Sequence, residues 1–180
     1  LKKLNNGILL STDNYYKTDF FSKFLSIWID CYFEKKISFN YNLFKKDLNF
    51  IVENRKFDHF FIYDFKNKTS KRYLKKTNDI EFVIVEGIFA NEFLCDLKSP
   101  RFLTIELKIS KEICMNRVIN RDVNERGKDK ARAKRDFMKS WQYFYTKNKK
   151  MDLLDNKSRI FFSNEKDMDF LIDRILKFKN

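Results

Sequence analysis

Short apolar runs that alternate with helical patterns limit the fold of this chain more than any other feature. Five such runs predict β-strands, because each is short and rich in β-branched or aromatic residues. They are Ile8–Ser11, Phe60–Phe65, Phe82–Phe89, Phe102–Ile109 and Arg159–Phe162. Within the third run, Val83–Val85 is apolar without a break, which is typical of a strand buried on both faces of a parallel sheet.

Helical patterns fill the intervals between these strands. The segments whose apolar residues recur at helical spacing are Leu43–Val52, the surroundings of Ile113 and Val118, residues 131–150, and Phe170–Leu176. Alternating strands and helices predict an α/β fold with a mainly parallel sheet, in which ligands bind at the carboxyl ends of strands. The 180 residues contain no repeat or linker, so residues 1–180 are predicted to form a single domain.

The charge balance points to several classes of partner. The net charge is +13, from 38 Lys and Arg against 25 Asp and Glu. Such an excess is typical of proteins that bind nucleic acid, anionic lipid or phosphate ligands. It also accompanies the Lys-, Asn-, Ile- and Phe-rich composition of AT-rich coding sequences, so charge alone does not identify a partner.

The apolar runs and the cysteines indicate the cellular compartment in which the protein is expected. No apolar run approaches the length of about 18 residues that predicts a transmembrane helix, so no membrane association is expected. Cys31, Cys95 and Cys114 form no CxxC pair or zinc pattern, and they are predicted to be buried thiols in a reducing compartment. A cytoplasmic protein is therefore expected.

Two carboxylates stand at predicted strand ends. Asp13 follows the first strand, where it could accept a proton from a substrate hydroxyl or help to hold Mg²⁺. Its alternative role is that of a turn or helix-capping residue. Glu86 ends the apolar strand and precedes Gly87, a position suited to binding a metal through water. The alternative there is an exposed strand end followed by a glycine turn.

A basic run, Arg121–Lys130, follows a predicted helix and is interrupted by Gly127. Cations that converge on one place repel one another unless an anion joins them, and charge-assisted hydrogen bonds to phosphate would offset that repulsion. The alternative is a solvated helix end, in which Asp122, Glu125 and Asp129 pair with the cations. Together with the two carboxylates, the run supplies the base, metal holder and cationic groups that phosphoryl transfer needs.

Four strings of residues resemble the uridine kinase branch of the P-loop kinases, and more distantly phosphoribulokinase and nicotinamide riboside kinase. They are DNYYK from Asp13, IYDF from Ile62, VIVEGIFA from Val83 and RDVNERGKDK from Arg121. The resemblance implies a three-layer P-loop-kinase-like fold. It also implies ATP and Mg²⁺ as cofactors and transfer of the γ-phosphate to a hydroxyl of a nucleoside such as uridine or a related riboside.

The resemblance also implies roles for single residues. Asp13 would act as general base and lie next to Mg²⁺, and Glu86 would hold the metal through water. Residues that would face the transferred phosphates are Arg117, Arg121, Arg126 and Lys128, of which Arg121 and Arg126 are expected to be catalytic. Residues that would bind the substrate are Tyr16, Asp30, Tyr63, Phe65 and Lys68, with Asp30 at the ribose hydroxyls.

Departures from the family pattern qualify these expectations. The 180 residues contain no GxxxxGKS/T, and their glycines are Gly7, Gly87 and Gly127. Because the chain begins at Leu1, we expect it to be N-terminally incomplete, without the first strand and the P-loop, and therefore impaired in activity. Lys68 stands where the family tends to have His, and Val118 where it often has Arg, so another acceptor remains open.

The rival hypothesis is a non-catalytic remnant of such a kinase that binds phosphate or nucleic acid through the basic run. Against it, the aromatic residues follow core patterns and are not interleaved with Lys on one face. The partner expected from the sequence is therefore a nucleoside-like small molecule, without nucleic acid. A homo-oligomer is a further expectation.

Overall fold

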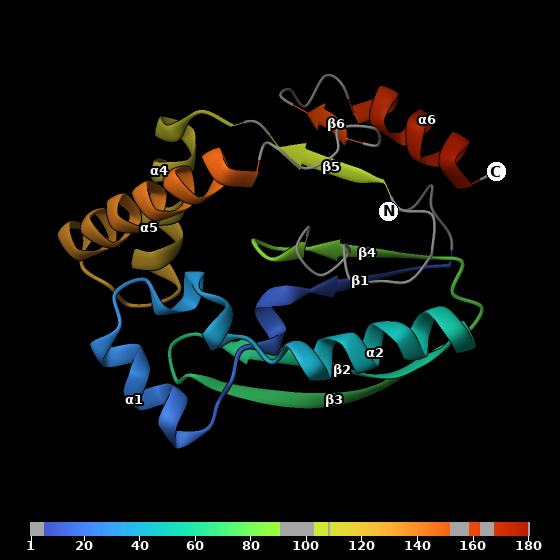
Figure 1. Cartoon of the computed structure of the whole chain (residues 1–180), viewed down its shortest axis with the longest axis horizontal. Helices are drawn as coiled ribbons and strands as arrows, with labels where there is room; N and C mark the ends of the chain where they lie inside the picture. Colours follow the sequence, from blue (N-terminus) through green and yellow to red (C-terminus); the bar gives the residue numbers. More distant parts are fainter. Residues whose placement is uncertain (1–5, 91–102, 108, 152–158, 163–167, 180) are drawn as a thin grey trace. The chain divides into compact units, whose positions relative to one another are not determined.

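The computed structural model describes residues 6–90, 103–107, 109–151, 159–162 and 168–179 (Figure 1). Contacts within the chain divide it into two compact units, Leu1–Asp96 and Leu97–Asn180. Each unit has its own paired strands and its own helices. The single domain expected over residues 1–180 stays a prediction.

A parallel strand pair lies at the centre of the first unit. Strand β1 (Gly7–Ser11) pairs with β4 (Phe82–Glu86), and Ser11 lies opposite Glu86 in the register. Ile8 and Leu10 of β1 are buried, whereas Leu9 between them is 48% exposed, which is the alternation expected of a strand with one covered face. Both strands end at the same edge of this sheet. This edge was predicted from the carboxylates Asp13 and Glu86 at the ends of two strands.

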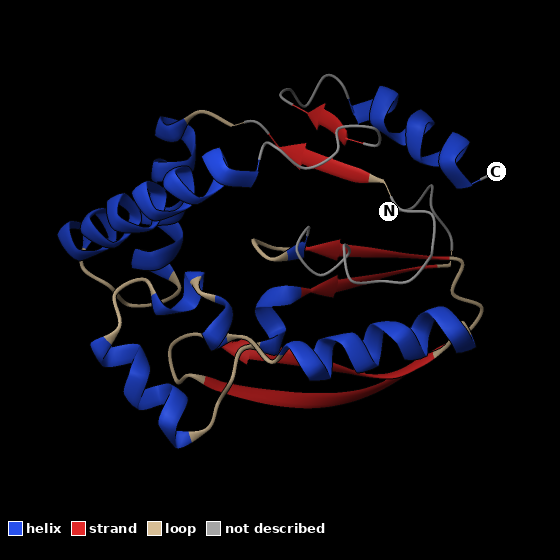
Figure 2. Cartoon of the chain, in the orientation of Figure 1, coloured by secondary structure: helices blue, strands red, loops and turns tan. Residues whose placement is uncertain are grey.

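A β-hairpin forms the second strand pair of this unit (Figure 2). Strand β2 (Phe57–Asp64) runs antiparallel to β3 (Thr69–Thr77). The Asp64 carboxylate closes the turn, because its Oδ1 accepts backbone N–H bonds from Lys66 at 2.9 Å and Asn67 at 3.0 Å. The sequence predicted β2 but missed β3, whose residues are mostly exposed and so lack the apolar signal on which the prediction depended.

The two α-helices of the first unit begin at side-chain caps. The Asp19 carboxylate accepts the backbone N–H of Ser22 at 2.8 Å, and the Asn40 side chain accepts that of Leu43 at 3.3 Å. The helices are α1 (Phe20–Trp28), α2 (Tyr41–Asn54) and the single turns η1 (Thr12–Tyr15), η2 (Tyr32–Glu34) and η3 (Lys36–Ser38). The predicted face of α2 is confirmed at Phe44, Leu48 and Ile51, which are buried, but not at Val52, which is 41% exposed.

A buried carboxylate joins three elements of the first unit. Asp47 on α2 is 4% exposed and accepts a hydrogen bond from the Tyr15 hydroxyl at 3.0 Å. The Nε2 atom of His59 on β2 lies 3.4 Å from the same oxygen, Oδ2. Burial raises the pKa of Asp47, while both neighbours oppose that rise. Because Tyr15 belongs to η1, this network holds the turn that carries Asp13.

The second unit also contains a parallel strand pair. Strand β5 (Thr104–Leu107) pairs with β6 (Arg159–Phe162), and its helices are α4 (Lys111–Asn124), α5 (Lys130–Met151) and α6 (Met168–Lys179). These elements confirm the strands and helices that the sequence predicted there. Ile119 of α4 and Ala133 and Phe137 of α5 are buried. The Asp129 carboxylate caps α5 by accepting the backbone N–H of Arg132 at 2.8 Å.

Two further sequence-based expectations concern membrane-spanning helices and the cysteines. In the described part of the chain, the helices are all too short or too polar to span a bilayer. Cys31 and Cys114 are half-buried thiols and not the buried ones that the sequence predicted, and Cys95 lies outside the described residues.

Gly87→Ala is expected to destabilise the first unit strongly. Gly87 has a φ of +122, and a Cβ there would overlap the Thr12 hydroxyl, so strain and steric overlap combine to about 3 kcal/mol. Gly127→Ala is the matched control, because Gly127 has a φ of +66 but nothing within 4 Å of its Cβ position. It should cost about 1 kcal/mol. Urea unfolding measures both, and equal losses would contradict the role given to Thr12.

Candidate functional site

The carboxyl edge of β1 and β4 brings two predicted site residues to one end of the sheet. Asp13 lies in η1, two residues after the strand partner of Glu86, and is half-buried. Glu86 is the last residue of β4 and is exposed. Thr12, which precedes Asp13 in the chain, is fully buried and packs against Gly87. The glycine is thus required by the close approach of the two strand ends.

Tyr16 follows η1 and is buried beside Asp13. Its hydroxyl donates to the backbone carbonyl of Phe33 at 2.9 Å and lies 3.4 Å from Asp13 Oδ1. Burial raises the pKa of Tyr16, and the negative charges of Asp13 and Glu34 raise it further. A phenol has one hydrogen to donate, so Phe33 and Asp13 compete for it, and the contact to Phe33 is the shorter of the two.

An aromatic cluster of Tyr16, Tyr32, Phe33, Tyr63 and Phe65 lies next to Asp13. Ring centroids are 5.3 Å apart for Tyr16 and Tyr63, 4.9 Å for Tyr63 and Phe65, and 5.2 Å for Tyr16 and Phe33. The structure therefore brings together three predicted substrate-binding residues. Tyr32 and Phe33 were missed, because η2 is a single turn without a periodic apolar pattern.

One hydrogen bond ties this aromatic cluster to the turn that carries Asp13. The Asn14 side chain in η1 accepts the backbone N–H of Tyr63 at 3.1 Å. Burial raises the pKa of Tyr63 to about 12, with further contributions from Tyr32 and Asp64. Tyr63 is therefore a neutral phenol at physiological pH, and it can both donate and accept a hydrogen bond.

Two other predicted substrate-binding residues lie apart from these contacts. Lys68 has a φ of 52 in the hairpin turn, and its Nζ donates to Ser26 Oγ of α1 at 2.8 Å. Asp30 is exposed in the turn after α1. The acid that raises the pKa of Tyr16 together with Asp13 is Glu34 of η2, which the sequence analysis did not select.

In the second unit, a single buried carboxylate collects the cations of the basic run. Asp122 is 3% exposed, and its carboxylate lies 3.1 Å from Arg121, 3.2 Å from Arg126 and 2.9 Å from Lys128. The Lys128 ammonium also contacts Asp136 at 2.9 Å. Burial opposes ionisation of Asp122, but the cations outweigh it and hold its pKa below the usual range. Of the three acids considered as partners from the sequence, Asp122 takes this role, whereas Asp129 caps α5.

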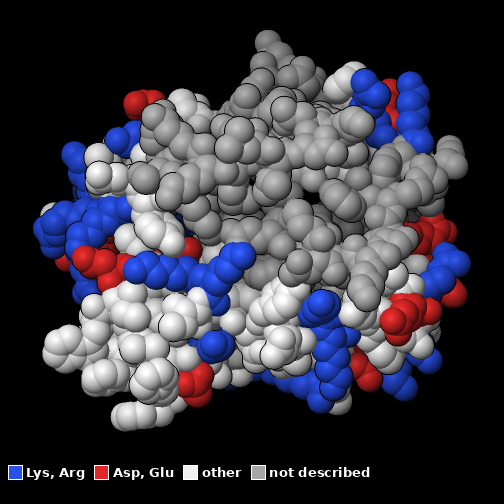
Figure 3. All heavy atoms as spheres, viewed as in Figure 1, with Lys and Arg blue, Asp and Glu red and all other residues white. Residues whose placement is uncertain are grey.

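Lys and Arg side chains are visible at the surface on the face drawn in Figure 3, and those of Arg121, Arg126 and Lys128 are 43%, 21% and 27% exposed. The Arg121 side chain is 43% exposed, and it directs only Nε and Nη2 at Asp122. A guanidinium carries five N–H donors, so the remaining ones can bind an anion. Arg117 lies exposed one helical turn earlier on α4. The arrangement holds several cations close together and leaves part of their surface accessible.

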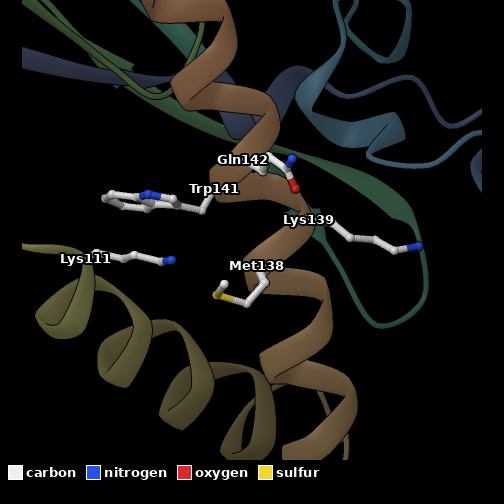
Figure 4. Close-up of a pocket in the computed structure, with 5 residues that line it drawn as sticks. All are labelled: Lys111, Met138, Lys139, Trp141 and Gln142. Atoms are coloured by element: carbon white, nitrogen blue, oxygen red, sulfur yellow. The ribbon is translucent and has the colours of Figure 1, made fainter.

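A shallow groove of about 420 Å³ lies elsewhere on the second unit (Figure 4). It is lined by Lys111, Met138, Lys139, Trp141 and Gln142. The groove contains no site residue predicted from the sequence, so we assign it no role in the candidate chemistry. Among the described residues, no group of three or more His, Cys, Asp or Glu could hold a metal. Mg²⁺ commonly needs only one or two carboxylates beside substrate phosphates.

Comparison with models of known protein families shows which family this chain belongs to. The model of the Phosphoribulokinase / Uridine kinase family matches residues 30–159. The chain belongs to this family. It is 36% identical over 125 residues to a uridine kinase of Borrelia hermsii, covering 67% of this chain and 57% of that protein. A uridine kinase of Borrelia duttonii is 32% identical over 129 residues, covering 69% and 59%. The chain thus spans less than two thirds of these relatives.

Solved structures show the same fold. YFH7 from Saccharomyces cerevisiae, a candidate P-loop containing kinase with a circular permutation, aligns with a TM-score of 0.61 at 12% identity. The alignment covers 91% of this chain and 60% of the YFH7 chain. A candidate fructose transport system kinase from Silicibacter sp. TM1040 gives 0.59 at 9% identity, covering 78% and 70%. The predicted α/β fold of the P-loop kinase type is confirmed.

Asp122→Asn is expected to destabilise the second unit by about 2 kcal/mol at pH 7, because the three cations lose their shared counter-charge. The folded-state pKa of Asp122 lies below its unfolded value, so its charge stabilises the unit above the unfolded pKa. This contribution is lost as pH falls through the folded pKa.

Urea unfolding at pH 7 and at about pH 3 measures this effect, since carboxylates titrate near pH 4. The difference between Asp122→Asn and the wild type should shrink at the lower pH. Asp136→Asn is the control, because Asp136 contacts the same Lys128 but its side chain is 43% exposed. If both variants lose the same stability, Asp122 does not organise the cations.

Proposed function

We propose that this chain is part of an ATP-dependent kinase that transfers the γ-phosphate to a hydroxyl of a nucleoside such as uridine or a related riboside. The observation that carries the proposal is Asp13, a carboxylate at the carboxyl edge of a parallel strand pair, beside the aromatic cluster. Identity of 36% to the Borrelia hermsii uridine kinase supports the choice of a nucleoside.

The aromatic cluster is the proposed acceptor site. Its rings offer apolar faces on which a flat base can stack, a contact worth about 1–3 kcal/mol per base. Tyr63 and Tyr16 add neutral phenols. Asp30 and Glu34 are the acids proposed for the ribose hydroxyls, and Glu34 is the better supported because it acts electrostatically on Tyr16 beside Asp13.

Asp13 is the proposed general base. It accepts the proton of the acceptor hydroxyl as that oxygen bonds to the γ-phosphorus and the bond from this phosphorus to the β-phosphate oxygen breaks, which releases ADP. This role requires an ionised carboxylate within hydrogen-bond reach. Bound Mg²⁺ would neutralise charge on the phosphates of ATP. Asp13 and Glu86 are the proposed holders of the ion, and their positions at adjacent strand ends suit a metal that retains several waters.

The basic cluster of Arg117, Arg121, Arg126 and Lys128 is proposed to bind the phosphates of ATP. Asp122 holds three of these cations close together in the absence of phosphate, because its negative charge offsets the repulsion between them. Preorganised charge of this kind stabilises the phosphoryl-transfer transition state without rearrangement. The 180 residues contain no GxxxxGKS/T, so transfer by this chain alone is proposed to be slow.

Tyr63→Ala is expected to weaken uridine binding by about 10- to 100-fold, because it removes a stacking surface at the centre of the aromatic cluster. Isothermal titration calorimetry on the 180-residue chain measures the affinity. Tyr73→Ala is the control, since Tyr73 on β3 is 47% exposed and outside the cluster. Binding of polynucleotides but not of uridine would favour the non-catalytic remnant.

Asp13→Asn is expected to reduce phosphate transfer from ATP to uridine by about 10²- to 10⁴-fold, because an amide cannot accept the proton. Uridine affinity should change little, since the amide is nearly isosteric with the carboxylate. Radiolabelled transfer in the presence of Mg²⁺ at high enzyme concentration measures the rate. Asp79→Asn, in an exposed turn, is the matched control. An undiminished rate in Asp13→Asn would exclude Asp13 as the base.

A further inference from the structure

Tyr32 carries a buried hydroxyl that the proposed chemistry has not used. The residue lies on η2 and is 3% exposed. Within the part of the chain that the structure describes, its Oη atom has no hydrogen-bond partner. A phenol removed from water without a partner destabilises the folded state, so it calls for an explanation.

The residue before Tyr32 has an unfavourable backbone conformation, which is a second destabilising feature of this turn. Cys31 has φ 52 and ψ 39, the left-handed region that a residue with a Cβ seldom adopts. This conformation starts η2 and directs the chain so that Tyr32 packs against Phe33, with ring centroids 5.4 Å apart. Strained backbone and unsatisfied polar groups recur together where a protein holds a ligand.

The position of the hydroxyl indicates which ligand group it would meet. Phe33 links Tyr32 to Tyr63, whose ring centroid lies 6.3 Å from that of Phe33. Tyr32 also contributes to the raised pKa of Tyr63, so the two phenols lie within electrostatic reach of each other. They belong to the same aromatic cluster that flanks Asp13. A polar group of a bound acceptor could therefore contact both.

Lys68 does not supply this contact in the structure. Its Nζ atom is engaged by Ser26 on α1 at 2.8 Å, and it belongs to the hairpin turn. A phenol differs from an ammonium because it can both donate and accept a hydrogen bond. It therefore suits a neutral heterocycle that presents a carbonyl beside an N–H.

We propose that the Tyr32 hydroxyl is a specificity-determining contact for the base of the acceptor, and that it selects a neutral base edge carrying both a carbonyl and an N–H. The inference rests on the proposed function, in which the aromatic cluster binds a nucleoside. A hydroxyl that is unpaired in the free protein and paired in the complex has a distinctive signature. Its removal weakens binding without weakening the fold.

Tyr32→Phe tests the proposal because it deletes only the hydroxyl. Calorimetric titration with uridine should show a Kd about 10-fold higher than that of the wild type. The thermal midpoint of the free variant should equal or exceed that of the wild type, since the lost hydroxyl has no partner among the described residues. Tyr73→Phe, which makes the same change at an exposed site on β3, should leave both measurements unaltered.

Tyr15→Phe provides the opposite comparison for stability. The Tyr15 hydroxyl donates to the buried Asp47, so its removal should lower the thermal midpoint. If Tyr32→Phe lowers the midpoint in the same way, its hydroxyl has a structural partner and the inference is wrong. If the wild type binds uridine and Tyr32→Phe binds it equally well, the inference alone fails. If the wild type binds no nucleoside, the proposed function fails and the inference falls with it.

Discussion

The parallel pairing of β1 with β4 is the interaction on which the candidate site depends. Its register places Ser11 opposite Glu86, so the chain leaves both strands at one edge of the sheet. The close approach there admits only a glycine after Glu86, because the buried Thr12 side chain occupies the space that a Cβ would need. A shift of one residue would move Glu86 away from the turn that carries Asp13 and exchange the covered and exposed faces of β1.

Each unit also contains a buried carboxylate that organises its functional residues without being part of the proposed chemistry. Asp47 ties η1 to α2 and β2 through Tyr15 and His59. Asp122 gathers three cations at the end of α4. Both groups are costly to bury, and both are stabilised by several donors. Asp47 thereby supports the position of Asp13, and Asp122 sets the spacing of the cations proposed to bind phosphate.

Much of this arrangement could be predicted from the sequence. Strands β1, β4 and β6 and helices α2, α4, α5 and α6 have apolar patterns strong enough to be found, because packing against a core imposes those patterns. Strand β3 was missed since most of its side chains face solvent. Helix α1 was not predicted either, and it keeps Phe20, Ile27 and Trp28 more than 70% exposed, at 86%, 75% and 73%. Its apolar residues lie on one side of the helix, but that side is exposed and Ser22 on the other side is buried, so the pattern does not reflect packing against the core.

Sequence alone determined the family, the carboxylates at two strand ends and the basic run, because these are properties of residue type and order. Tertiary structure decided which side chains meet. It selected Glu34 as the acid that acts on Tyr16, directed Lys68 to Ser26, and gave the Tyr32 hydroxyl no partner within the described part of the chain. It also paired the cations with Asp122. The physical reason is that these contacts depend on single turns and on a left-handed residue, whose geometry comes from packing and leaves no periodic trace in the chain.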